Sequence, residues 1–344
     1  MDSLQRVRRR SSGAGGAQPW ATSHATCSNW MVVWWMRKRS RTASFTWRRM
    51  RSPHAWAIAV RRASGEIVSR SEPLDRPSDR RPWLGWPLIR GVAMLGQAMS
   101  LGVRALRFSA NVALDEALPE QNDEEKGKKK PEITGWMMSA NLIFSLAFFI
   151  FLYKFVPLVA TTKLAALIPS FRSQIAFNLV DGAIRIALFL LFIWGISLWA
   201  DIRRVYEYHG AEHKTVFNFE SGDPLSIAAA QKFSTYHPRC GTSFLMTVML
   251  IAILVFTLIP VSSFGARFAV RVALLPLIAG LSYEIIRFSA RRRGSLFALL
   301  TQPGLWLQRV TTQPPDDGMV ECAITSLDLA MALERQRGGE LVVA

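Results

Sequence analysis

The sequence is poor in cysteine, histidine and acidic side chains. Its 344 residues include 3 Cys and 5 His, and 25 Asp and Glu stand against 42 Lys and Arg, for a net charge of +17. Widely separated cysteines exclude a disulfide framework, so we expect reduced thiols. The basic residues flank the apolar blocks, which the positive-inside rule explains better than nucleic-acid binding does. We therefore expect the lipid bilayer as a partner and no nucleic acid.

Long apolar segments are abundant, since 50% of the residues are hydrophobic. They predict membrane spans at residues 136–160, 176–200, 242–260 and about 268–286. The last of these is interrupted by charges, so a re-entrant or half-buried helix remains an alternative there. The predicted fold class is mainly α. We expect a polytopic membrane protein with about four transmembrane helices, amphipathic juxtamembrane helices and a small N-terminal β-hairpin.

Several charged side chains lie within the predicted spans. Lys154 is expected to snorkel towards an end of the first span. Asp181 and Arg185 are four residues apart and can pair on one helix face, and Glu284 can pair with Arg287 in the same way. We interpret these pairs as structural, in preference to a proton or ion pathway.

Two amphipathic patterns precede the first span. Residues 54–71 alternate apolar and small side chains around a turn at Gly65, which predicts a hairpin. Residues 88–112 predict a helix whose apolar stripe includes Leu106, whereas Leu101 interrupts the polar side. Such a helix packs on two faces, along the lipid headgroups or against the membrane bundle.

The chain is expected to divide into five parts. They are residues 1–49, disordered or mistranslated; 50–114, the hairpin and amphipathic helix; 115–135, a charged linker; 136–290, a four-span membrane domain with a His/Cys loop at 201–241; and 291–344, a tail in which a polar connector precedes a helix at about 317–335. We expect the spans to lie in the inner (plasma) membrane. The distribution of basic residues then predicts that the loop and both termini are cytoplasmic.

The His/Cys loop contains His209-Gly-Ala-Glu-His213. On a helix, the two histidines lie one turn apart, about 5–6 Å between their Cβ atoms, and can bind one zinc ion. The pattern His-x-x-Glu-His is the inverted zincin signature, which makes Glu212 the candidate general base for a metal-activated water. Glu220 lies two turns further along and is a candidate third ligand.

His237-Pro-Arg-Cys240 follows in the same loop. His237 and Cys240 are residue types that zinc favours, and Cys240 precedes a predicted helix, where a thiolate is stabilised. Together with the first two histidines they could complete a four-ligand structural site. The alternatives are histidines that only form hydrogen bonds, and a Cys240 nucleophile with His237 or His213 as base.

Four segments carry a resemblance to a known family: YHGAEHKTVFNFE at 208–220, HPRCGTSF at 237–244, YEIIRFSARR at 283–292 and PGLWLQRVTTQPPDD at 303–317. They resemble the YqhQ-like family, bacterial membrane proteins with a domain of unknown function. The resemblance implies a multi-pass membrane protein labelled a metal-dependent enzyme. The chain lacks the family's Gly-rich opening before Met50, and it has Pro314 where the family has Glu.

Two functions remain open at this point. The first is a metal-dependent hydrolase with zinc on His209, His213 and one of His237, Glu220 or Cys240. The second is a non-catalytic scaffold or assembly factor that binds other membrane proteins and contains structural zinc. Three ligands beside Glu212 favour the enzyme, and four protein ligands favour the scaffold.

Overall fold

The computed structural model describes residues 29–32 (backbone only), 54–75, 77–117, 135–237, 240–261, 263–291 and 302–336. Most of the segments 1–49 and 115–135 therefore lie outside the described residues. The elements are β1 Asn29–Val32, β2 His54–Arg61, β3 Ile67–Leu74, α1 Pro77–Arg80, η1 Pro82–Gly85, α2 Ile89–Ala117, α3 Gly135–Ile150, the π-helix η3 Phe151–Phe155, α4 Val156–Leu167, η4 Pro169–Arg172, α5 Gln174–Ser197, α6 Ala200–Ser221, α7 Ile227–Ala230, α8 Gly241–Leu258, α9 Phe264–Ala273, α10 Leu275–Arg291, α12 Gln302–Thr311 and α13 Asp317–Gln336.

The described residues contain 3 helical segments long and apolar enough to cross a membrane, Ala140–Leu167, Gln174–Ser197 and Gly241–Leu258. A fourth candidate combines α9 with most of α10, and the two helices meet at a bend of 48°. Pro276 follows the break, where its missing N–H and its ring prevent an uninterrupted helix. The predicted multi-pass architecture with about four spans is confirmed, and the bent fourth segment is either a broken span or a re-entrant loop.

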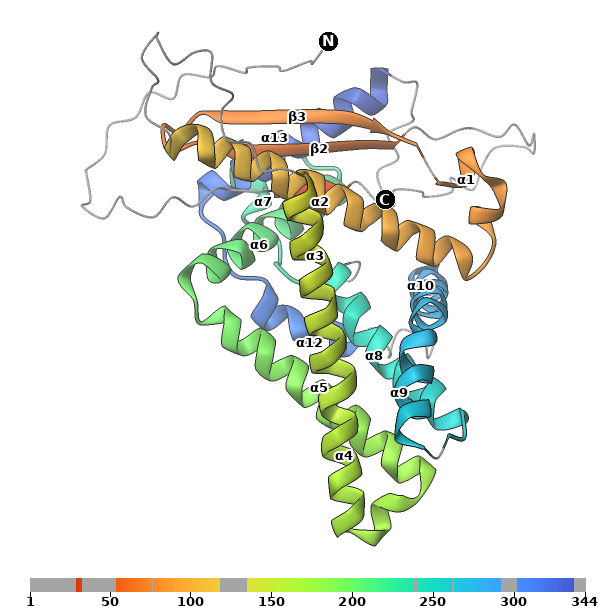
Figure 1. Ribbon diagram of the computed structural model, residues 1–344. Coiled ribbons are helices and arrows are strands. Elements are labelled where there is room, and N and C mark those ends of the chain that lie inside the picture. The colour runs from red at the N-terminus through yellow and green to blue at the C-terminus, as the bar shows by residue number, and fades with distance from the viewer. Residues whose placement is uncertain are drawn as a thin grey trace, which may run out of the picture.

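The sheet and α13 form a cap at one end of the spans, while the α4–α5 turn lies at the opposite end (Figure 1). β2 and β3 form the predicted antiparallel hairpin, β1 pairs with the other edge of β2, and Gly65 turns with a φ of 83°. Alternate β2 residues face opposite ways. Trp56 and its neighbours on one face pack on α2, and Ala57 on the other face packs with Ala330 of α13.

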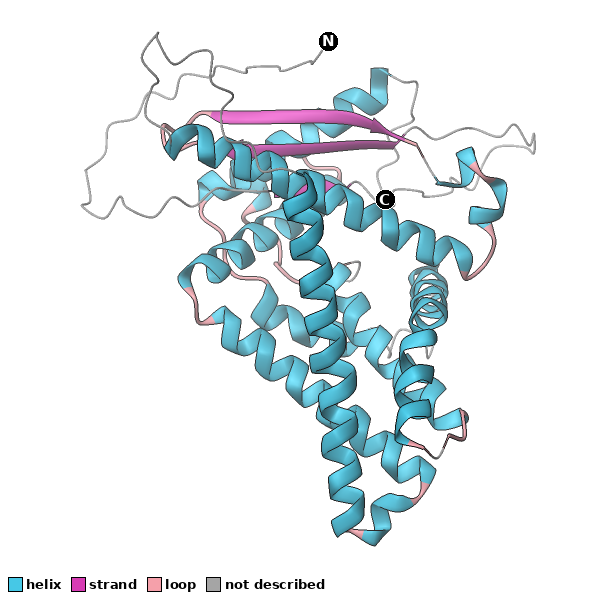
Figure 2. Cartoon of the chain, viewed as in Figure 1, coloured by secondary structure: helices cyan, strands magenta, loops and turns pink. Residues whose placement is uncertain are grey.

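α2 lies across the ends of the spans, between them and the sheet (Figures 1 and 2). Its core face is the one with Leu101, which is buried against the sheet, whereas Leu106 of the predicted apolar stripe is 53% exposed. Arg90 donates two hydrogen bonds to Glu284 and so ties α2 to α10. The helix therefore uses two faces, as expected, but the predicted polar side is the better buried one.

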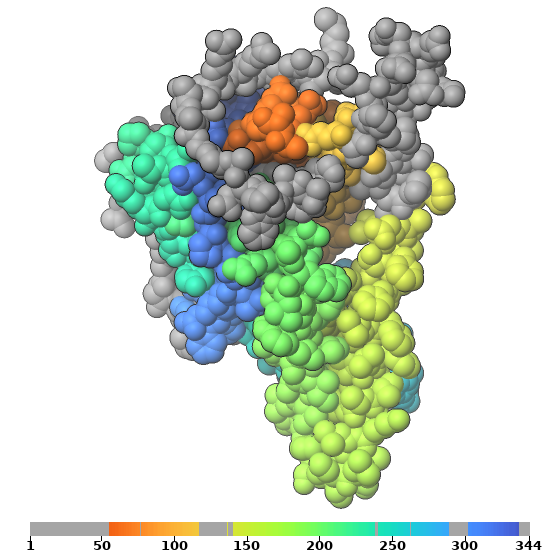
Figure 3. Space-filling view, turned by 90° about the vertical axis from the view of Figure 1, so that its left-hand side faces the viewer, coloured from red at the N-terminus to blue at the C-terminus, as the bar shows by residue number. Residues whose placement is uncertain are grey.

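Two sequence-based expectations are wrong. Residues 302–311 form the helix α12 instead of a polar connector, and α12 packs so closely on α8 that a Cβ on Gly304 would lie 2.5 Å from Ser243. α12 lies beside α5 on the face shown in Figure 3. Lys154 does not snorkel, because it is only 9% exposed within the π-helix that joins α3 to α4. In both cases tertiary packing outweighs local polarity.

The two faces of α2 lead to a stability prediction. Leu101→Ala leaves a cavity against the sheet and should lower the free energy of unfolding by about 2–5 kcal/mol. Leu106→Ala on the same helix is the matched control and should change it by less than about 0.5 kcal/mol. Thermal and denaturant unfolding in mild detergent measures both, and equal effects would contradict the assignment of the core face.

Candidate metal centre

The candidate centre begins on α6, which continues unbroken from Ala200 to Ser221. His209 and His213 lie one turn apart on it, with ring centroids 4.5 Å apart. Gly210 between them does not break the helix. A Cβ there would lie 2.1 Å from the carbonyl oxygen of Gln313, and Gln313 itself donates to the carbonyl of Tyr206 at 2.9 Å. The glycine thus lets the chain after α12 approach the histidine helix.

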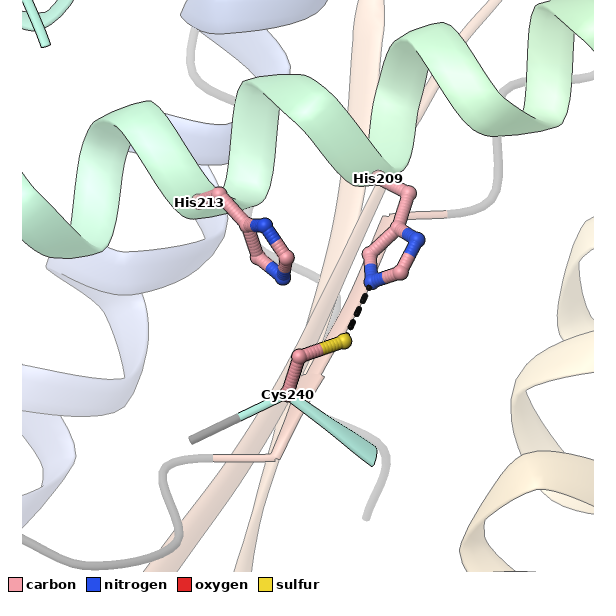
Figure 4. Close-up of side chains that lie close together, drawn as sticks. All are labelled: His209, His213 and Cys240. Carbon is pink, nitrogen blue, oxygen red and sulfur yellow. Dashed lines mark hydrogen bonds between the residues drawn. The ribbon is translucent and has the colours of Figure 1, made fainter. Parts of the chain in front are cut away.

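Cys240 comes from a different element, because it is the N-cap of α8 and its sulfur accepts from the backbone N–H of Thr242. Its Sγ lies 3.1 Å from His209 Nε2 (Figure 4). The ligand atoms of His209, His213 and Cys240 all lie within 4.8 Å of one another. Tetrahedral zinc places such atoms about 3.3–3.6 Å apart, so a movement of about 1 Å would complete the geometry.

Backbone carbonyls hold both imidazoles in place. His209 Nδ1 donates to the carbonyl of Thr311 at 2.7 Å, and His213 Nδ1 donates to the carbonyl of Thr235. A donating Nδ1 leaves Nε2 as the metal-binding nitrogen, and this outer arrangement is typical of histidine ligands. Sequence reasoning missed both carbonyls, because any residue type supplies one.

The other two predicted ligands lie beside this group. His237 Nε2 is 3.6 Å from a carboxylate oxygen of Glu220. Buried Gln308 of α12 accepts from the His237 N–H at 2.7 Å and donates to its carbonyl at 2.9 Å. The ring centroids of His213 and His237 are 5.7 Å apart. Of the five predicted ligands, the structure therefore brings three together and pairs the remaining two next to them.

Without a metal, His209 and Cys240 form an ion pair beside His213. Burial lowers the pKa of His209, but the hydrogen bond and charge of Cys240 outweigh it and raise that pKa to about 9. Burial raises the pKa of Cys240, and the hydrogen bonds of His209 and His213 lower it to about 4. Burial and the charge of His209 lower the pKa of His213. A divalent metal requires a thiolate and neutral imidazoles, so its binding would displace the proton of His209.

Glu212, the predicted base, lies on the same helix as the histidines and is partly exposed. Burial of its carboxyl raises its pKa to about 8, the charge of His209 opposes this, and the charge of Cys240 adds to it. A pKa near neutrality suits a group that takes up and releases protons.

Comparison with known proteins identifies the family of the chain. The model of the family described as "Protein of unknown function (DUF1385)" matches residues 86–333. The chain belongs to this family. It is also 31% identical over 288 residues to the "Uncharacterized protein YqhQ" of Bacillus subtilis (strain 168), covering 82% of this chain and 88% of that protein. No solved structure matches this DUF1385 protein.

The ion pair makes a pH prediction for the metal-free protein. Since the pKa of Cys240 is lowered to about 4, its thiolate is present above that pH and is lost only as the pH falls through 4. With Cys27 and Cys322 replaced by Ala, the alkylation rate of Cys240 after chelation should stay nearly constant from about pH 6 to 8. The unfolded protein is the control, with a rate that rises about tenfold per pH unit. The same steep rise in the folded protein would contradict the pair.

Proposed function

We propose that the protein is a zinc protein of the membrane surface, with His209, His213 and Cys240 as its protein ligands. The observation that carries this proposal is the approach of the three ligand atoms within 4.8 Å. Three protein ligands leave the fourth position of a tetrahedral ion open to water or substrate, and two histidines with one cysteine are a ligand set of catalytic zinc. A three-ligand group therefore favours the hydrolase over the scaffold.

In this hydrolase, bound zinc supplies the Lewis acid that polarises the substrate and activates water. The chain's own residues do the rest. Glu212 takes up the proton that the attacking water loses and delivers it to the leaving group. The carbonyls of Thr311 and Thr235 keep both imidazoles oriented. Because Cys240 directly precedes the span α8, the bond that is cleaved belongs to a peptide or a lipid-linked group at the membrane surface.

The proposal places the centre on the cytoplasmic side of the plasma membrane, together with both termini. The cap and α6 lie at the same end of the spans (Figure 1). Among the residues that the structure describes, most of the basic side chains outside the spans lie at this end, and the positive-inside rule assigns such an end to the cytoplasm. A reduced cytosol also keeps Cys240 available as a thiolate.

A structural zinc site in a membrane scaffold is the second candidate. The observation that favours it is the buried ring of His237, 5.7 Å from that of His213. A shift of this ring away from Glu220 would supply a fourth protein ligand and close the site. Exposed apolar faces of the cap and spans would then bind partner membrane proteins.

Metal analysis tests the ligand set. The wild-type protein, purified without chelators in mild detergent, should contain about one zinc ion per chain. His209→Ala combined with His213→Ala, and separately Cys240→Ser, should lose it. Cys322→Ala is the matched cysteine control and His237→Ala separates the two candidates, and both should retain zinc. Absence of any transition metal in the wild type would refute the centre, and zinc loss in His237→Ala would favour the scaffold.

Glu212→Gln tests catalysis. It keeps the size of the side chain and removes its capacity as a base, so zinc content and folding should persist while activity falls by a factor of about 10² or more. The measurement is rescue of the growth or envelope phenotype of a deletion strain, with zinc content measured in parallel. Glu207→Gln on the same helix is the control and should rescue fully. Full rescue by Glu212→Gln as well would eliminate the hydrolase.

A further inference from the structure

The membrane domain contains a second group of charged side chains, near the middle of the spans and away from the candidate metal centre. Lys154 of η3, Arg185 of α5 and Arg271 of α9 are 9%, 2% and 2% exposed, and Asp181 of α5 is 1% exposed. The pair of Asp181 with Arg185 was expected from the sequence. The addition of Lys154 from η3 and Arg271 from α9 was not, because these residues are far from the pair in the chain.

Asp181 is shared between the two arginines. Arg185 Nη2 donates to one of its oxygens at 2.6 Å, and Arg271 Nη1 donates to the other at 2.7 Å. Neutral oxygens complete the contacts: Arg271 Nη2 donates to Asn178 Oδ1 at 3.0 Å, and Arg185 Nε donates to the carbonyl of Tyr153 at 2.9 Å. One carboxylate thus serves as the counterion for two guanidinium groups.

Loss of protons cannot remove the resulting positive charge. A lysine can become neutral when it is buried, but a guanidinium group stays protonated in a protein. Even with neutral Lys154, Arg185 and Arg271 therefore exceed Asp181 by one charge. An unpaired charge within a membrane costs about 2.5–3.5 kcal/mol or more. The structure around these side chains must offset that cost.

The protein offers only partial compensation. All three cations lie near the Phe256 ring, with Lys154 Nζ, Arg185 Cζ and Arg271 Cζ at 5.2, 5.6 and 5.5 Å from its centroid. A single aromatic ring cannot stabilise three cations fully. Arg185 Nη1 is also buried without a hydrogen-bond acceptor among the described residues. An acceptor with negative charge is what this group lacks.

We propose that the cluster of Lys154, Arg185 and Arg271 binds a phosphate-type oxyanion within the membrane domain, either free phosphate or the phosphodiester of a lipid headgroup. Guanidinium groups bind oxyanions through paired N–H donors, and an ammonium adds a point charge, so this set favours a tetrahedral oxyanion over a halide. Arg185 Nη1 and Lys154 Nζ provide the direct contacts. The anion neutralises the charge that Asp181 leaves unbalanced.

The position of the cluster indicates how the anion reaches it. Arg185 lies about three turns from the start of α5, roughly 16 Å along the helix. Arg267 lies one turn before Arg271 on α9, is partly exposed, and stacks 4.0 Å from the centroid of Phe177. Arg267 therefore extends the positive charge to the bundle end opposite the metal centre. The phosphate comes from that side, as a free ion or as a phospholipid headgroup.

Thermal unfolding of the full-length, zinc-loaded protein in mild detergent tests the proposal. Inorganic phosphate is added at constant ionic strength in one arm, and phosphatidylglycerol is compared with phosphatidylcholine in the other. One of them should raise the unfolding midpoint of the wild type by at least about 3 °C. Stabilisation by inorganic phosphate identifies the free ion, and stabilisation by phosphatidylglycerol alone identifies the lipid headgroup.

Two variants and a control make the test specific. Lys154→Met should abolish the shift, whereas Lys163→Met, an exposed lysine of α4, should keep it. Asp181→Asn removes the competing carboxylate, so its midpoint should fall without anion and rise more with anion than that of the wild type. Bound phosphorus is measured in each sample, so that a site already filled on purification is recognised. Neither a shift nor bound phosphorus in the wild type, or an equal shift in Lys154→Met, would overturn the proposal.

Discussion

The contact between His209 and Cys240 is the constraint on which the rest of the structure depends. It joins α6, at the cap end of the spans, to the residue that directly precedes the span α8, with 3.1 Å between Nε2 and Sγ. A buried thiolate and imidazolium are each costly alone, and each stabilises the other. The elements that surround them, α12 and the chain after it, must therefore lie where they shield the pair and supply acceptors to the second imidazole nitrogen.

Glycine and backbone carbonyls make that arrangement possible. Gly210 admits Gln313 against α6, and Gly304 admits Ser243 against α12. Once these segments are in contact, the carbonyls of Thr311 and Thr235 meet the two Nδ1 atoms. The geometry of the candidate centre thus follows from close backbone packing, and the protein alone orients its two imidazoles. Such preorganisation would suit the proposed zinc site, which keeps one position open.

Buried charges also have to be stabilised within the spans, and there they are stabilised without a thiolate. Buried charges there meet each other across α5, α9 and the π-helix, and the break before Pro276 allows Arg271 to reach Asp181. The cap is held together by a separate core, in which β2 is buried on both faces between α2 and α13. The candidate metal centre at the cap end and the cationic cluster near the middle of the spans therefore belong to one framework, and each depends on helices that stop or bend where a straight span would continue.

Much of this could be predicted from the sequence, because apolar length, period and charge are local properties. Hydropathy located the spans, alternation located the hairpin, and the i,i+4 spacing placed His209 beside His213. Local patterns could not distinguish Cys240 from His237 as the partner of these histidines, because that choice depends on where α8 begins and where Gln308 holds the His237 backbone. They also misassigned α12 and Lys154, whose polar side chains are buried by contacts with distant segments. The sequence by itself determined the membrane architecture and the types of the candidate ligands. Only the tertiary structure decided which ligands meet, since that depends on the packing of helices far apart in the chain.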